Sequence, residues 1–292
     1  MLTAQEVLVL DRLSFGAVGA AASPHSSGSR TVRARGFGME FHDFRRYQPG
    51  DDPRYVDWTI QARLRQLVVR EFRADGHLRV HLILDSSRSM AAGTPDKLSC
   101  GRRLAALLSY VAARRGDALG MATFDATVRE VLLPAAGRVQ WQRVLDTLQS
   151  VGAAGASQTN RALMDYGALT HGPGLGVVIS DFFDERGAFE GLQYLAHRGL
   201  MPAVIQVVAP EEIDPDIVDD AELVDVEHPG ARGLVVDRRA VQRYKERLAR
   251  HANELAEFCA AHDMVCTRVV SSMSFAELLR ACIDAGVLAS RA

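Results

Sequence analysis

The stretch LILDSSRS, residues 82–89, decides the fold. Its first three residues are apolar and typical of a buried strand, and a polar turn follows that opens on Asp85. Ligands of doubly wound sheets bind at the carboxyl ends of the central strands. A D-x-S-x-S turn at such an end supplies the carboxylate of Asp85 and the hydroxyls of Ser87 and Ser89, hard oxygen ligands that suit Mg²⁺ or Mn²⁺.

Short β-rich runs alternate with helical periodicity downstream of this stretch. The expected strands are residues 78–84, 118–124, 128–133, 175–180, 201–208 and 264–270. The expected helices are residues 97–115, 139–150, 160–170, 188–198 and 238–262, with a closing helix that begins at Ser274. This alternation predicts an α/β fold, a doubly wound and mostly parallel sheet covered by helices on both faces. Only a hairpin fits between the second and third strands, so one edge strand should be antiparallel.

Two later positions add oxygen ligands to the same edge of the predicted sheet. Thr159 opens a predicted helix after a loop of small residues, and Asp181 follows an apolar strand. We therefore predict a metal site built from one D-x-S-x-S turn and two further loops, with the ligands Asp85, Ser87, Ser89, Thr159 and Asp181. Three neutral hydroxyls leave the cation incompletely neutralised, so it can accept a carboxylate from a second protein.

These residues resemble the metal-ion-dependent adhesion site (MIDAS) of von Willebrand factor A-type domains. Upstream, GFGMEF at residues 36–41 and RRYQPGDDPRYVDW at residues 45–58 are similar to the signature of the prokaryotic family known as domain of unknown function 58. The resemblance implies a von Willebrand factor A-like domain and a MoxR-type AAA+ ATPase, or a client of one, as the partner. Many members also carry membrane helices, which are not evident in this sequence.

Three regions follow from the composition. Residues 1–29 should hold a short helix (5–13) and a Gly, Ala and Ser-rich flexible linker, residues 30–77 form an arginine-rich extension, and residues 78–292 form the von Willebrand factor A-like domain. The extension contains no lysine, and acidic residues are interleaved with its arginines. These charges could form Arg–carboxylate ion pairs that brace the main domain, or they could dock a partner. The candidate residues for those roles are Arg46, Tyr47, Asp51, Asp52, Arg54, Asp57 and Trp58.

The composition of the 292-residue chain excludes several classes of protein. Apolar residues make up 48% and charged residues 24%, as in ordinary globular proteins, and the net charge of −2 favours neither nucleic acid nor an anionic membrane as a partner. Apolar runs are too short for a membrane span, and the N-terminus lacks the pattern of a secretory signal, so we expect a cytoplasmic protein.

Enzyme functions find less support in the sequence. Asp85 after a strand is reminiscent of a phosphoaspartate nucleophile, but the haloacid-dehalogenase-type pattern requires an acid/base aspartate where Ser87 stands. We expect a protein-interaction module. The alternatives are a Mg²⁺-dependent phosphoryl-transfer or hydrolytic enzyme at the same crevice, and an adaptor that binds its partner without metal.

Overall fold

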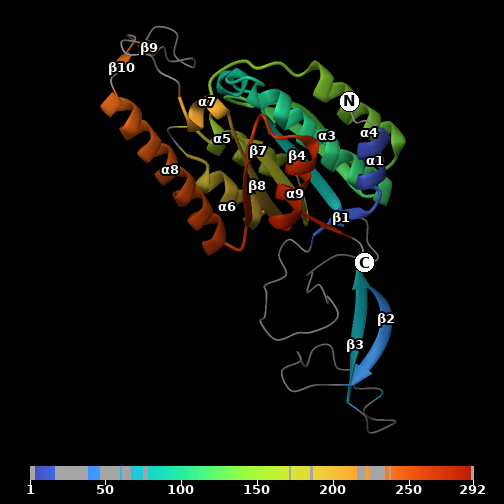
Figure 1. The fold of residues 1–292 in the computed structure, drawn as a ribbon. Coiled ribbons are helices and arrows are strands. Elements are labelled where there is room, and N and C mark those ends of the chain that lie inside the picture. The colour runs from blue at the N-terminus through green and yellow to red at the C-terminus, as the bar shows by residue number, and fades with distance from the viewer. Residues whose placement is uncertain are drawn as a thin grey trace. The chain divides into compact units, whose positions relative to one another are not determined.

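Six strands form the central sheet of the computed structural model, in the order β11-β8-β7-β4-β5-β6 (Figure 1). All neighbours pair in parallel except β5 and β6, which pair antiparallel at one edge. The mostly parallel sheet and its antiparallel edge strand are thus confirmed. The strands are β4 (Arg79–Asp85), β5 (Ala118–Phe124), β6 (Val128–Ala135), β7 (Gly174–Ser180), β8 (Leu200–Val208) and β11 (Val265–Val270).

The structure describes residues 4–16, 39–46, 60, 67–74, 78–170, 172–184, 187–215, 221–223, 234–236 and 238–290. The chain divides into two units, one made of residues 1–19 and 78–292 and the other of residues 20–77. The first unit contains the central sheet.

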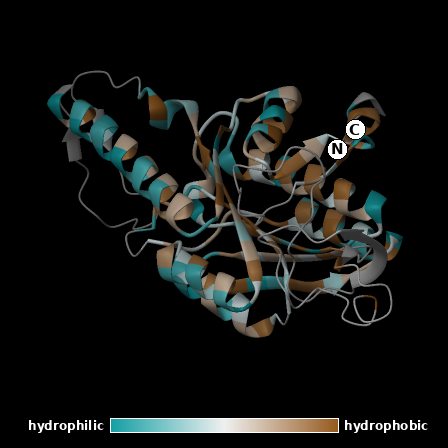
Figure 2. Ribbon diagram, turned by 90° about the horizontal axis from the view of Figure 1, so that it is seen from below, coloured by the Kyte–Doolittle hydropathy of each residue, from teal (hydrophilic) through white to brown (hydrophobic). Residues whose placement is uncertain are grey.

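Helices cover both faces of this sheet because side chains of each strand alternate between two cores. On β4, Val80, Leu82 and Leu84 enter one core, and Ile83 enters the other. The first core is closed by α1 (Ala4–Leu10), α3 (Lys97–Arg115), α4 (Arg138–Ser150) and α9 (Phe275–Asp284), and the second by α5 (Thr159–Leu169), α6 (Phe189–His197) and α8 (Arg238–Ala261). Hydrophobic residues lie along the central strands, and α8 carries many hydrophilic residues (Figure 2).

The boundaries of the long helices follow local capping chemistry. The Asp96 carboxylate accepts a hydrogen bond of 2.7 Å from the Ser99 N–H at the start of α3, and Gly116 ends the helix in the left-handed conformation. The closing helix expected from Ser274 is α9, and Ser274 starts it with a capping box in which Glu277 is the third helical residue. Strong end signals explain why α3 has the bounds expected from the sequence.

The N-terminal segment differs from its expected form. The sequence predicts a helix over residues 5–13, but α1 ends at Leu10 and Leu13 begins β1 (Leu13–Phe15), which pairs antiparallel with β12 (Leu288–Ser290). A turn at Asp11 and Arg12 lets Leu10 and Leu13 both reach the core. The predicted helix is too long because Leu13, the buried first residue of β1, continues the apolar periodicity of α1.

The second unit contains an antiparallel pair, β2 (Met39–Arg46) and β3 (Val68–Ala74), which the sequence analysis did not predict. Arg46 is the last residue of β2. The linker residues 17–29 and the other candidate brace or docking residues, Tyr47, Asp51, Asp52, Arg54, Asp57 and Trp58, lie outside the described residues.

Short elements complete the description. They are the 3₁₀-helix η2 (Arg88–Ala91), the helix α7 (Pro210–Ile213) and the antiparallel pair β9 (Ala221–Leu223) and β10 (Leu234–Val236). Over the described ranges, no helix combines the length and the apolar character that crossing a bilayer requires.

Candidate metal centre

The five predicted ligands lie at the carboxyl edge of the central sheet, on three segments. Asp85 is the last residue of β4, Asp181 directly follows β7, and Thr159 is the first residue of α5. Ser87 is the N-cap residue of η2, and Ser89 is the second residue of η2. All are buried except Ser89, which is half-buried.

Backbone hydrogen bonds join the loop before α5 to the turn after β4. The Ala154 N–H donates to the Ser86 carbonyl at 2.8 Å, and the Arg88 N–H donates to the Gly155 carbonyl at 2.9 Å. Gly155 has a φ of +72°, and a Cβ on it would lie 2.6 Å from an oxygen of Asp125. Glycine therefore fits this position beside Asp125, and the two backbone hydrogen bonds join the segment before Thr159 to the turn that follows Asp85.

The Asp85 carboxylate accepts three hydrogen bonds from protein groups. Its Oδ1 accepts from the Ser87 N–H at 2.8 Å, an Asx turn that the D-x-S spacing favours. Its Oδ2 accepts from the Ser180 hydroxyl at 2.6 Å and from the Ser157 hydroxyl at 3.4 Å. Both hydroxyls were missed in the sequence analysis, although Ser180 immediately precedes Asp181.

Hydroxyl pairs connect the remaining predicted ligands. The Ser157 and Thr159 hydroxyl oxygens lie 3.1 Å apart, and those of Ser87 and Ser89 lie 3.0 Å apart. The Thr159 N–H also donates to the Asp184 carboxylate at 2.7 Å, which satisfies a free donor at the start of α5. Asp85, Ser157 and Thr159 thus form one continuous hydrogen-bonded group.

Asp181 is held by a cation from the protein itself. Its Oδ2 lies 2.7 Å from Lys97 Nζ, and the same ammonium lies 2.5 Å from Glu212 Oε1. The other oxygen, Oδ1, accepts from the Phe183 N–H at 3.1 Å. Lys97 Nζ also sits 5.0 Å from the centre of the Phe183 ring. The sequence analysis missed Lys97, since lysines are rarely fully buried and no motif marked this one.

The turn after β7 has an uncommon backbone conformation. Phe182 is buried and has a φ of +60°, which a residue with a bulky side chain seldom adopts. Its N–H donates to the Ser180 hydroxyl at 2.9 Å. Such conformations cost of order 1 to 3 kcal/mol and cluster at functional sites. Here the conformation places Ser180 on Asp85 while Asp181 faces Lys97.

The electrostatics of the site reflect its burial. Burial, and then the charge of Asp181, raise the pKa of Asp85 to about 7. Burial by itself lowers the pKa of Lys97, but the charges of Asp181 and Glu212 outweigh that effect and hold it above its ordinary value. Asp85, Asp181 and Glu212 are three acids for one base. The ionised group therefore has an excess of negative charge.

This donor set fits a hard divalent cation. The oxygens come from carboxylates and hydroxyls, and the raised pKa of Asp85 is that of a buried carboxylate with too little positive charge nearby. The described part of the chain gathers no group of three or more His, Cys, Asp or Glu side chains suited to a metal. A site here would depend on hydroxyl ligands, and the metal-binding role of the five residues stays a prediction.

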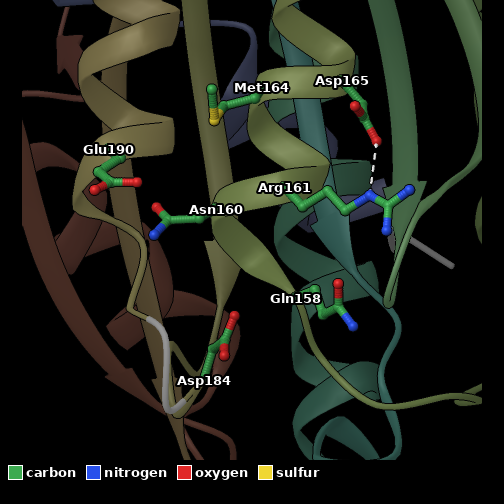
Figure 3. A pocket seen from close by; sticks show the side chains of 7 residues that line it. All are labelled: Gln158, Asn160, Arg161, Met164, Asp165, Asp184 and Glu190. Atoms are coloured by element: carbon green, nitrogen blue, oxygen red, sulfur yellow. Dashed lines mark ion pairs between the residues drawn. The ribbon is translucent and has the colours of Figure 1, made fainter.

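A pocket of about 460 Å³ opens beside Thr159, between the starts of α5 and α6 (Figure 3). Arg161 and Asp165 form an ion pair of 3.7 Å on its wall, and Met164 adds an apolar surface. The remaining lining residues are Gln158, Asn160, Asp184 and Glu190. None of the five predicted metal ligands is among the residues that line this pocket.

The chain is similar in sequence to mycobacterial proteins and in structure to several solved proteins. It is 28% identical to the uncharacterized protein Rv1480 of Mycobacterium tuberculosis over 226 residues, which cover 76% of this chain and 71% of Rv1480. Among solved structures, it is similar to the conserved hypothetical protein BatB of Bacteroides thetaiotaomicron, with 20% identity, a TM-score of 0.45, and 70% and 94% of the two chains covered.

A second structural likeness is to proximal thread matrix protein 1 of the mussel byssus, which was solved with a zinc-occupied MIDAS motif. It has 14% identity and a TM-score of 0.37, and the match covers 46% of this chain and 38% of that one. The family model described as "Protein of unknown function DUF58" matches residues 43–254. This match spans most of the chain, and the protein therefore belongs to the DUF58 family.

Proposed function

We propose that the protein is an interaction module whose α/β unit binds an acidic side chain of a partner protein through a divalent cation, Mg²⁺ or Mn²⁺. Asp85, Ser87, Ser89, Thr159 and Asp181 would hold the cation. When bound, the cation offers an open coordination position to a carboxylate of the partner. The observation that carries this proposal is the excess of buried acids at the edge of a parallel sheet, where doubly wound folds bind their ligands.

The residues around the cation have separate tasks in this proposal. The hydroxyls of Ser157 and Ser180 orient Asp85, so its lone pairs need little rearrangement to meet a metal ion. Ser87, Ser89 and Thr159 are neutral and leave the cation's charge largely available to a partner. The family resemblance makes a MoxR-type AAA+ ATPase, or its client, the partner to test, in a cytoplasmic setting.

Calorimetric titration with Mn²⁺ tests the metal site. We expect binding to the unmodified protein and none to the Asp85→Ala variant. Asp146→Ala is the matched control, since Asp146 is exposed on α4, which packs into a different core from α5. Equal heats for the protein and the Asp85→Ala variant would reject the site.

Interferometry against a MoxR-type ATPase of the same organism tests the bridging role. Removing one member of a buried charge contact costs about 2 to 5 kcal/mol, so EDTA or Asp181→Ala should weaken association about tenfold or more. Moderate salt should have a smaller effect, because a desolvated contact is poorly screened.

A second candidate is an adaptor that binds its partner without metal. The contact of Lys97 with Asp181 favours it, because a cation already neutralises one of the two predicted carboxylate ligands. Association of equal strength in Mg²⁺ and in EDTA would support this candidate and reject the bridging mechanism. A phosphatase screen with Mg²⁺ separates both from the enzyme alternative.

A further inference from the structure

Lys97 occupies a place that is unfavourable for a positive charge. It is the first residue of α3, where the helix dipole disfavours cations, and its side chain is fully buried. Two carboxylates, Asp181 and Glu212, offset these costs with contacts of 2.7 and 2.5 Å. A small apolar residue would fill the start of α3 without such costs. We therefore look for an effect of the positive charge of Lys97 on the site, beyond its contribution to packing.

That effect follows from the atoms Lys97 contacts. Asp181 Oδ2 accepts from the ammonium, and Asp181 Oδ1 accepts from the Phe183 N–H. A divalent cation on Oδ2 would share that oxygen with Lys97 or displace the ammonium, and on Oδ1 it would bind a carboxylate whose charge the ammonium already neutralises. It would also feel the repulsion of a positive charge in a buried setting, where screening is weak.

We propose that Lys97 sets the metal affinity of this site: its ammonium neutralises Asp181 and thereby weakens the binding of a divalent cation. This inference rests on the proposed function. The weak hold makes metal occupancy depend on the arrival of the partner's carboxylate, so that cation and partner bind cooperatively. Glu212 modulates the effect, because it draws part of the ammonium's charge away from Asp181.

The test compares charge variants by calorimetric titration with Mn²⁺ on the full chain. Lys97→Met removes the ammonium and keeps the length of the side chain, so we expect Mn²⁺ to bind at least about tenfold more tightly. Glu212→Gln removes the second carboxylate from the ammonium, so more of its positive charge acts on Asp181. We therefore expect Mn²⁺ to bind a few-fold more weakly. The matched control is Lys245→Met, which breaks an ion pair with Asp214 that lies at the protein surface, and it should leave the affinity unchanged within about twofold.

Thermal unfolding with and without Mn²⁺ supplies a second measurement. Metal-free Lys97→Met should melt below the unmodified protein, because Asp181 and Glu212 are left without their cation. Mn²⁺ should raise its melting temperature by more than it raises that of the unmodified protein, since tighter binding stabilises the folded state further.

The outcomes separate this inference from the proposed function. Weaker or unchanged Mn²⁺ binding by Lys97→Met overturns the inference while leaving a metal site in place, and it would assign Lys97 a structural role. Binding by Lys97→Met but not by the unmodified protein supports the inference, and association with the partner in Mg²⁺ and in EDTA then decides whether a metal bridge forms in the natural chain. Absence of binding by both proteins overturns both. If Lys97→Met does not fold, unchanged or tighter binding by Glu212→Gln overturns the inference.

Discussion

Asp85 couples the stability of the metal-free protein to pH. Its pKa rises from an ordinary value of 3.8 to about 7 in the folded state, chiefly through burial. Between these values the folded protein keeps a proton that the unfolded chain has lost, so stability falls as pH rises through this window. We expect the free energy of unfolding to decrease by up to a few kcal/mol between about pH 4 and pH 7 from this group.

Urea denaturation at several pH values, in the presence of EDTA, measures this decrease. Asp85→Asn keeps the shape of the side chain without its titration, so the decline should flatten in that variant. Added Mn²⁺ should restore stability at the upper end of the window, where the carboxylate is ionised. An equal decline in the Asp85→Asn variant would assign the pH dependence to other groups.

The sequence revealed the strand-end residues of the site but not their surroundings. Asp85 and Asp181 each follow an apolar strand, and the carboxyl ends of parallel strands share one edge, so their proximity could be foreseen. Lys97 and Glu212 carry no such mark. Each is charged, and only the tertiary packing of α3 and α7 reveals that Lys97 contacts both Asp181 and Glu212.

At the scale of elements, Gly191 of α6 allows this helix to pack closely against α5. A Cβ on Gly191 would lie 2.8 Å from the Leu163 Cβ and 2.9 Å from the Asn160 carbonyl oxygen. Because Asn160 follows Thr159, a shift of α5 would also move a predicted metal ligand.

We expect Gly191→Ala to lower the free energy of unfolding by about 1 to 3 kcal/mol, through overpacking against backbone that cannot rotate away. The measurement is urea denaturation. Gly152→Ala is the control, because Gly152 has open space around its Cα and should tolerate a methyl group. Equal stability of both variants would show that α5 and α6 can separate without cost.

The predictability of the elements followed their length and the strength of their end signals. The helix over residues 97–115 combines long periodicity with Asp96 and Gly116 at its ends, and its bounds were predicted correctly. Strands of three residues, such as β1 and β12, have too few positions for a period of two. Their pairing joins segments from opposite ends of the chain, which no local pattern encodes.

At the scale of the whole molecule, the first unit is closed by its two ends. β1 pairs with β12, and α1 packs near α3, so Leu10 and Leu13 belong to the core that α3 and α9 share. Arg114 of α3 lies 2.9 Å from the Asp11 carboxylate, and the Tyr110 hydroxyl donates to the same group at 2.8 Å. These contacts fix the turn between α1 and β1 over the outer surface of α3.

This closure makes a leucine near the N-terminus as important as one in the central sheet. Leu10 is 1% exposed and Leu8, on the same helix, is 68% exposed. Truncation of a buried leucine costs about 2 to 5 kcal/mol, whereas an exposed one contributes little. We therefore expect Leu10→Ala to lower the melting temperature by several degrees and Leu8→Ala to leave it nearly unchanged, measured by calorimetry of the full chain. Equal melting of the two variants would mean that α1 is dispensable and that the α/β unit is stable without its N-terminal segment.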